Sequence, residues 1–226
     1  MDRRGHGASG NSPDYALRRE AEDVAAVVNS RPDRVFVLGH SFGGVAALEA
    51  AFLTDRIAKL VLYEPPVREH DHSAVLAKME NLIRQGDREQ ALVTFMEEIV
   101  MISPTEVRAM KARPSWPALV ASVESSIRQD RALSAYRFDP KRIRALTLPT
   151  LLLTGSETTS LELREAIRAL QDALPNWRLV VFKGQQHNAM DTVPQQFADA
   201  VQTFLTGTED HPAGARQAFP GGTPPR

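Results

Sequence analysis

Cysteine is absent from this sequence of 226 residues, and its absence removes several classes of function at once. Without thiols the chain has no disulfide bonds, no thiolate metal sites and no cysteine nucleophile. An excess of charge of one sign is also lacking, because 27 Lys and Arg residues face 28 Asp and Glu residues and the formal net charge is −1. The basic residues are scattered, which excludes the basic patch of a nucleic-acid-binding protein. We therefore expect a small-molecule substrate and no nucleic-acid partner.

Long apolar runs are lacking as well. No run approaches the roughly 20 residues of a membrane-spanning helix. The opening "MDRRGHGASG" has basic residues but no apolar stretch behind them, so it is not a secretory signal. Nor is there a glycine-rich nucleotide-binding fingerprint. These absences predict a cytoplasmic protein with no membrane partner and no cofactor, and they leave its oligomeric state open.

The composition that remains is that of a globular protein, with 42% hydrophobic and 24% charged residues. Two apolar runs, residues 34–39 ("RVFVLG") and 57–66 ("IAKLVLYEPP"), predict strands buried on both faces. A helix is expected before them, starting at Ser12-Pro13 with a capping hydroxyl and a proline at the first helical position. That helix ends near Arg31-Pro32, and a second one is expected over residues 43–53.

Helical signals then replace strand signals for many residues. Asp87 with Gln90, and Ser103 with Glu106, have the spacing of residues that cap helix N-termini. Residues 67–145 are therefore predicted to form a helical insertion.

Strands resume at residues 146–155 and 176–184, with an amphipathic helix over 161–174 between them. A last helix is expected over 194–205. Because strand, helix and strand follow one another here, a parallel sheet is the simplest arrangement. We predict an α/β fold with three parts: a core of residues 1–66 and 146–206, a helical cap of residues 67–145, and a disordered tail of residues 207–226, rich in Gly, Pro and polar side chains.

The turn between the first predicted strand and its helix is Gly39-His40-Ser41-Phe42-Gly43. A serine hydroxyl becomes a useful nucleophile when a base takes its proton and neighbouring side chains leave its oxygen accessible. Gly39 and Gly43 reduce side-chain crowding at such a turn. The helix that starts behind Ser41 points backbone N–H groups, including that of Phe42, toward an anion forming on the substrate.

This strand, turn and helix resembles the nucleophile elbow of the α/β-hydrolase family. The resemblance implies an α/β-hydrolase fold in which Ser41 is the nucleophile and the Phe42 N–H contributes to the oxyanion hole. His187 lies after the last predicted strand and before the last helix, where this family has its general base. The order of Ser41 and then His187 along the chain agrees with that assignment.

The resemblance leaves two candidates for the carboxylate that orients the base. The family most often has an Asp three residues past a glycine that ends the strand here at Gly155, but Thr158 occupies that position and Glu157 precedes it. Some branches, such as the haloalkane dehalogenases, have the acid after the preceding strand, where this chain has Glu64. We place Glu157 slightly ahead of Glu64, and we expect Asp191 to belong to the start of the last helix.

The other histidines are weaker candidates. His6 lies in a glycine-rich loop, His40 is part of the elbow, and His211 is in the predicted tail. His70-Asp71-His72 has ligand-type side chains, but three adjacent residues converge on one metal ion only in a special loop. We therefore expect a solvated turn there and no metal site.

The opening "MDRRGHGASG" is similar to the loop that precedes the elbow unit in this family. The resemblance implies a chain that begins within a family domain, an apparently N-terminally truncated fold. Loss of a preceding strand would expose an apolar sheet edge at residues 34–39. Loss of the usual second oxyanion donor would cost on the order of 10²–10³ in rate.

The leading hypothesis is a serine hydrolase that cleaves an ester or related acyl bond through Ser41, His187 and Glu157 or Glu64, with the insertion over the substrate. Two alternatives stay open: a C–C hydrolase, lyase or cofactor-free haloperoxidase on the same fold, and a non-catalytic remnant or binding module. The apolar residues of the insertion line a pocket or, as we favour, form its own core. They are Leu76, Met79, Phe95, Met96, Met101 and Trp116.

Overall fold

The computed structural model describes residues 2–10, 12, 14–67 and 70–207. The chain divides into two compact units. The sheet unit consists of Val24–Pro66 and Asp139–Arg226, and the helical unit consists of Met1–Asp23 and Val67–Phe138.

This division differs from the predicted one at two places. Residues 1–23 group with the helical unit, whereas the sequence analysis placed them with the sheet. The helical unit ends at Phe138, before the predicted boundary at residue 145. Of the tail predicted to be disordered, residues 208–226 lie outside the described part of the chain.

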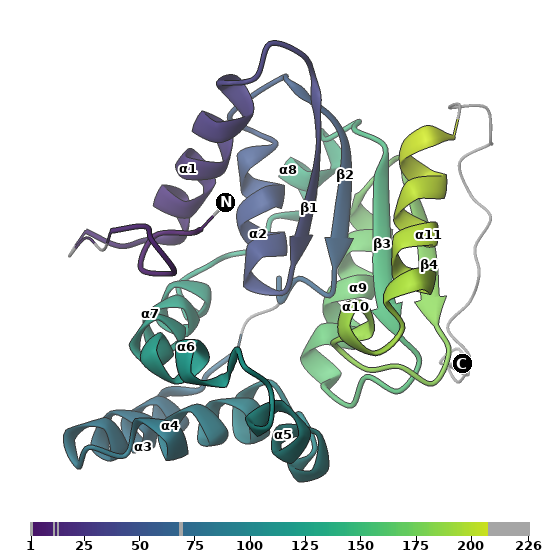
Figure 1. The fold of residues 1–226 in the computed structure, drawn as a ribbon. Helices are drawn as coiled ribbons and strands as arrows, with labels where there is room; N and C mark the ends of the chain where they lie inside the picture. The colour runs from purple at the N-terminus through teal and green to yellow at the C-terminus, as the bar shows by residue number, and fades with distance from the viewer. Residues whose placement is uncertain (1, 11, 13, 68–69, 208–226) are drawn as a thin grey trace, which may run out of the picture. The chain divides into compact units, whose positions relative to one another are not determined.

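The sheet unit is built on four strands that all run parallel (Figure 1). Each residue of the third strand is buried, and most of the second strand is buried too. Their continuous apolar sequences fit strands covered on both faces. The parallel sheet expected from the sequence is therefore confirmed. In sheet order the strands are β1 (Val35–His40), β2 (Ile57–Tyr63), β3 (Thr150–Gly155) and β4 (Trp177–Phe182).

The strand register brings the carboxyl ends of the strands together. His40, the last residue of β1, pairs with Tyr63, the last residue of β2. Tyr63 pairs in turn with Leu153 of β3, and Gly155 at the end of β3 pairs with Phe182 at the end of β4. The loops that follow the strands therefore start at one edge of the sheet, where open parallel sheets bind their ligands.

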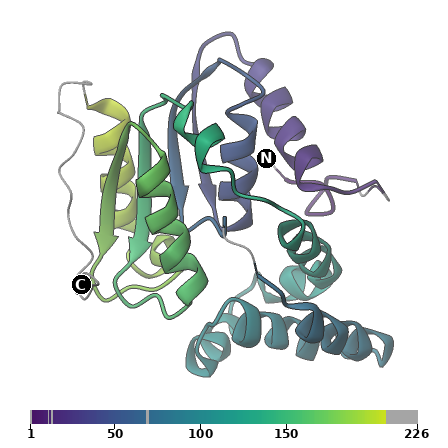
Figure 2. The same cartoon turned by 180° about the vertical axis from the view of Figure 1, so that it is seen from behind.

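Helices cover both faces of the sheet. Helix α9 (Leu161–Ala173) lies on one face and α11 (Pro194–Thr206) on the other, as the views from the front and from behind agree (Figure 1 and Figure 2). The buried residues of α9 recur at helical spacing, which gives it one apolar face for the strands. The other helices of this unit are α2 (Phe42–Ala50), α8 (Pro140–Arg144) and α10 (Ala189–Thr192).

Strand β1 stands at one end of the sheet order and pairs with β2 alone among the described strands. Its side chains Phe36 and Leu38 are 51% and 45% exposed. An apolar surface at this strand was expected from the sequence. The predicted burial of residues 34–39 on both faces is wrong for β1, because Phe36 and Leu38 remain exposed.

Helix α1 spans Leu17–Asn29 and therefore starts later than the predicted Ser12-Pro13.

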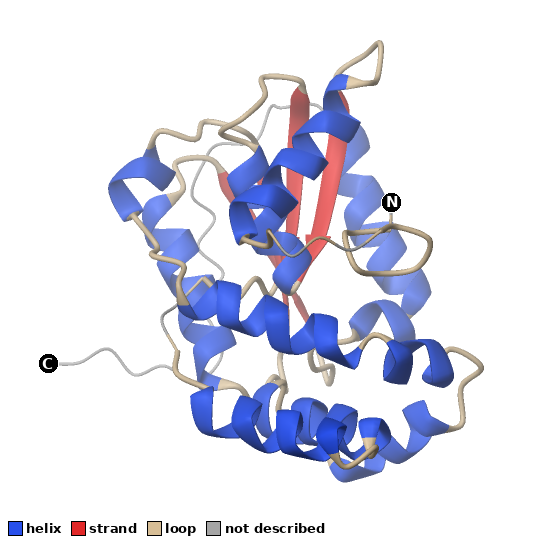
Figure 3. Cartoon of the chain, turned by 90° about the vertical axis from the view of Figure 1, so that its left-hand side faces the viewer, coloured by secondary structure: helices blue, strands red, loops and turns tan. Residues whose placement is uncertain are grey.

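The described residues of the helical unit form helices and loops but no strand (Figure 3). The predicted helix caps are present: Asp87 accepts a hydrogen bond from the Gln90 N–H at 2.9 Å, and Ser103 with Glu106 forms a reciprocal capping box. The elements are α3 (Ser73–Arg84), α4 (Arg88–Thr94), the π-helical turn η1 (Phe95–Ile99), α5 (Pro104–Lys111), α6 (Trp116–Ala121) and α7 (Val123–Ser134).

The helical unit has an apolar core of its own. Leu76, Met79, Met96 and Trp116 are buried in that core and Phe95 packs against it, as favoured from the sequence. The expectation is wrong for Met101, whose side chain is exposed. Across the described residues, no helix has the length and apolar composition needed to cross a bilayer.

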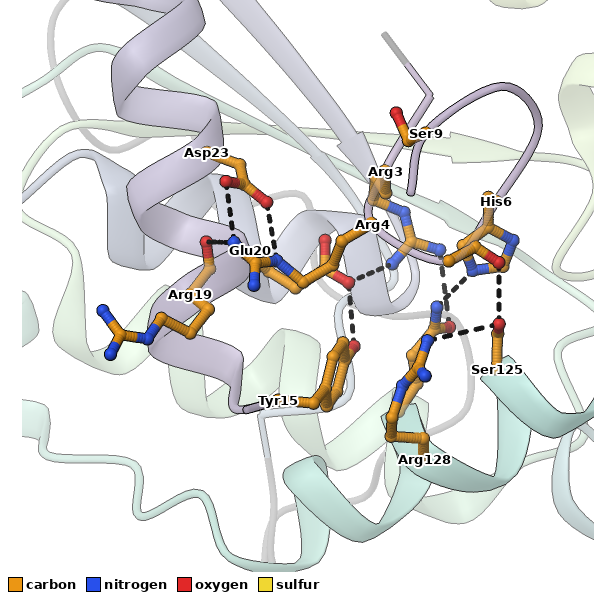
Figure 4. Close-up of polar contacts among 12 residues, drawn as sticks. Arg3, Arg4, His6, Ser9, Tyr15, Arg19, Glu20, Asp23, Ser125 and Arg128 are labelled. Carbon is orange, nitrogen blue, oxygen red and sulfur yellow. Dashed lines mark hydrogen bonds and ion pairs between the residues drawn. The ribbon is translucent and has the colours of Figure 1, made fainter. Parts of the chain in front are cut away.

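Residues 2–23 group with the helical unit because of contacts with α7 (Figure 4). The Ser125 hydroxyl donates to the Gly5 carbonyl at 2.8 Å, and the Arg128 guanidinium lies 4.4 Å from the centre of the Tyr15 ring. Tyr15 also donates to the fully buried carboxylate of Glu20 at 2.8 Å. These long-range polar contacts explain why the opening loop is assigned to this unit, which no local sequence pattern indicates.

Candidate active site

Ser41 occupies a strained turn between β1 and α2. Its backbone has φ 53° and ψ −127°, a combination that side-chain-bearing residues rarely adopt, and its N–H donates to the Tyr63 carbonyl at 2.9 Å. A Cβ atom on Gly39 would lie 2.5 Å from the Gly43 carbonyl oxygen, so only glycine fits there. A Cβ atom on Gly43 would meet no other atom, whereas a Cβ atom on Gly44 would lie 3.0 Å from the Pro65 Cβ. The tight packing expected at Gly43 is therefore found at Gly44.

Glu64 follows β2 directly and is fully buried, with a positive φ of 43°. Its Oε1 accepts three hydrogen bonds, from the hydroxyls of Thr154 and Thr158 at 2.6 Å each and from the Gly155 N–H at 3.0 Å. Its Oε2 lies 2.6 Å from Nδ1 of His187. Both carboxylate oxygens are thus satisfied, as a buried charge requires.

This arrangement sets the charge of Glu64. Burial alone would raise the pKa of the carboxyl, but the hydrogen bond and charge of His187, with the two threonine hydroxyls, outweigh burial and leave the pKa below its usual value. Glu64 is therefore ionised at neutral pH, and it holds the His187 Nδ1–H as a hydrogen-bond donor.

His187 is 6% exposed and held on several sides. Its carbonyl accepts a hydrogen bond from Nε2 of His40 at 2.9 Å, and the two rings are in tilted contact, with centroids 4.4 Å apart and an interplanar angle of 42°. The Tyr63 hydroxyl donates to the Gln186 carbonyl and accepts from the Ala189 N–H at 3.0 Å, which fixes the loop on both sides of His187. With Nδ1 donating to Glu64, Nε2 of the neutral ring is the nitrogen able to accept a proton.

The structure brings Glu64 and His187 into contact, but it keeps Glu157 apart from them. The Glu157 side chain is exposed and its carboxylate accepts a hydrogen bond from the Ser156 hydroxyl at 3.1 Å. Thr158, at the position where the resemblance implies an acid, instead donates its hydroxyl to Glu64.

Ser41 and Phe42 lie at the same carboxyl edge of the sheet. Ser41 follows His40, whose ring contacts that of His187, so the elbow and the imidazole are neighbours. Phe42 is the first residue of α2, so its N–H lies at the positive end of the helix dipole. A developing negative charge at this helix start would be stabilised.

Comparison with known proteins agrees with this geometry. A sequence profile described as "Alpha/beta hydrolase family" matches residues 1–200. The chain belongs to this family.

Three proteins similar to this α/β-hydrolase match most of its length. A solved α/β-hydrolase from Sphaerobacter thermophilus DSM 20745 is 30% identical with a TM-score of 0.76, and the match covers 91% of this chain and 80% of that one. RutD of Pseudomonas syringae pv. syringae (strain B728a), which bears the name of a carbamate hydrolase, is 26% identical over 212 residues, 89% of this chain and 81% of that protein. The esterase EaEST from Exiguobacterium antarcticum shares the fold, with 22% identity, a TM-score of 0.71, and coverage of 91% and 80%.

Several residues that shape this α/β-hydrolase site were missed in the sequence. Thr154 carries a signal in retrospect, because it is a polar residue at the carboxyl end of a buried strand that is mostly leucine. His40 and Tyr63 carry none, since their partners are the backbone around His187, more than 120 residues away.

Proposed function

We propose that this α/β-hydrolase is a serine hydrolase that cleaves an ester or related acyl bond of a small molecule. The observation that carries the proposal is the 2.6 Å contact of the buried Glu64 carboxylate with His187, at the sheet edge where Ser41 stands in its strained turn. A nucleophile, a base and a group that orients the base are the parts that acyl transfer needs. The name of the RutD relative adds carbamates to the esters as substrates to test.

In the proposed reaction the Ser41 oxygen attacks the carbonyl carbon of the substrate, and His187 Nε2 takes the hydroxyl proton. The carbonyl π bond opens to an oxyanion, which the Phe42 N–H stabilises at the start of α2. When the tetrahedral intermediate collapses, the bond to the leaving group breaks and His187 returns its proton to that group. Water then attacks the acyl-serine by the same steps, which releases the acid and restores Ser41.

Glu64 is the acid we assign to this triad, in place of Glu157. Its charge stabilises the imidazolium that forms during the reaction, and its hydrogen bond to Nδ1 keeps Nε2 directed to the proton transfer. Four hydrogen bonds hold this carboxylate. The exposed Glu157 has no such contact with the imidazole.

The first test measures hydrolysis of p-nitrophenyl acetate and of a matched p-nitrophenyl carbamate, together with labelling by a fluorophosphonate probe. We expect Ser41→Ala to lower kcat by at least about 10³-fold and to abolish the label. Ser30→Ala is the matched control, since Ser30 is exposed at the end of α1 and its hydroxyl donates to the Val27 carbonyl. A label that survives in Ser41→Ala, or equal turnover by the two variants, would refute the proposal.

A further inference from the structure

A second group of buried histidine and carboxylate side chains lies within the helical unit. His70 and His72 precede α3, and Asp130 belongs to α7. Their side chains are 2%, 14% and 4% exposed. A solvated turn was expected here from the sequence, and that expectation is wrong because α7 supplies a carboxylate that both imidazoles contact.

The three side chains lie close enough together to share one metal ion. Oδ1 of Asp130 lies 3.0 Å from Nδ1 of His72 and 3.5 Å from Nε2 of His70. One ligand atom from each of the three residues lies within 4.8 Å of the others. Ligands about 2.0–2.1 Å from a tetrahedral zinc ion stand about 3.4 Å apart. The two oxygen–nitrogen distances are already close to that value, and side-chain rotation would bring the two imidazole nitrogens to it from a separation of at most 4.8 Å.

An unsatisfied oxygen is an independent sign that something binds here. Oδ2 of Asp130 is buried and accepts no hydrogen bond from any residue in the described part of the chain. A buried carboxylate oxygen without a donor costs free energy, and a cation between it and the imidazoles would compensate that cost.

The three ligand-type side chains are not three consecutive residues, as was assumed from the sequence. Asp71 instead accepts a hydrogen bond from the Ser73 N–H at 2.9 Å. The third ligand comes from α7, 58 residues beyond His72. Two imidazoles and one carboxylate form a nitrogen and oxygen donor set of the kind that zinc accepts.

We propose that His70, His72 and Asp130 bind one divalent transition-metal ion, with Zn²⁺ the best match to the donor set and spacing. Three protein ligands leave one tetrahedral position for water or another small ligand. The ion would link the segment before α3 to α7 and so brace the helical unit. This proposal is independent of the one for Ser41, because it involves none of the same residues.

The test is a titration of the metal-free full chain with Zn²⁺ by calorimetry, and with Co²⁺ by visible absorption. We expect one ion per chain, a Kd in the micromolar range or tighter, and the intense Co²⁺ bands of four-coordinate geometry. His70→Ala, His72→Ala and Asp130→Asn should each weaken binding at least tenfold. A wild-type chain that binds no zinc, or three variants that bind like wild type, would overturn the proposal.

His187→Ala is the matched control, because it also removes a buried imidazole that contacts a buried carboxylate. We expect its zinc stoichiometry and affinity to equal those of wild type. Loss of zinc binding in this variant would assign the ion to Glu64 and His187 and refute the proposal. Circular dichroism checks the folding of each variant. If the alanine variants do not fold, His72→Gln and the Co²⁺ spectrum of wild type decide the question, since bands of a six-coordinate ion would contradict a tetrahedral site.

Discussion

Each unit of this protein buries a carboxylate against histidine, and the two sites differ in how the carboxylate is satisfied. Glu64 in the sheet unit accepts four hydrogen bonds shared between both oxygens, and a single imidazole is among the donors. Asp130 in the helical unit meets two imidazoles with Oδ1, while its Oδ2 is buried without a donor from the described residues. A fully satisfied carboxylate fixes one imidazole in one tautomer, whereas an under-satisfied one beside two nitrogens favours a cation.

The largest effect is expected from a substitution of Glu64, the carboxylate of the sheet unit. Glu64→Gln keeps the shape of the side chain but removes the charge that stabilises the imidazolium, so kcat should fall by about 10³–10⁴-fold. Glu157→Gln, the matched change at the exposed glutamate, should alter kcat by less than about threefold. Steady-state kinetics with a p-nitrophenyl ester measures both variants. The reverse ranking would return the role of the acid to Glu157.

The second prediction concerns the stabilisation of the folded protein by zinc bound at the site of Asp130. At a zinc concentration of about 100 times Kd, binding stabilises the folded state by about 2.7 kcal/mol, which corresponds to a Tm increase of about 5–10 °C for a protein of this size. Thermal unfolding followed by circular dichroism should show this increase for wild type and His187→Ala. For Asp130→Asn, whose affinity is expected to be at least tenfold lower, the increase should be about half as large or smaller. An equal increase in Asp130→Asn would place the ion elsewhere.

The smallest effect is the pH dependence of stability. The pKa of Glu64 is lower in the folded chain than its ordinary value of 4.5, so its ionisation contributes stability that is present above pH 4.5. That contribution is lost as the pH falls through the lower folded value. Below pH 4.5, urea unfolding should therefore show a steeper loss of stability for wild type than for Glu64→Gln, whose amide does not titrate. Parallel curves would contradict a depressed pKa.

The sequence predicted those features that rest on local patterns. Continuous apolar runs predicted the four strands, and the capping residues Asp87 and Ser103 predicted two helix starts that the structure contains. The strand, glycine turn and helix around Ser41 predicted the elbow, because backbone strain at such a turn is encoded within a few residues. The resemblance carried by that turn led to the right family.

Contacts between residues far apart in the chain could not be predicted from those local patterns. The choice between Glu64 and Glu157 depended on which carboxylate the fold buries beside His187, 123 and 30 residues away respectively along the chain. The assignment of residues 2–23 to the helical unit likewise depended on α7, more than 100 residues further on.

The helices and strands, the parallel sheet and the turn at Ser41 could thus be predicted from the sequence, because hydrophobic periodicity and the glycines of a turn act over short distances along the chain. The tertiary structure alone decided which charges meet. It buried Glu64 among Thr154, Thr158 and His187, and it placed Asp130 against His70 and His72. The cost of burying a charge depends on the partners that folding brings to it, and those partners lie far away in the chain.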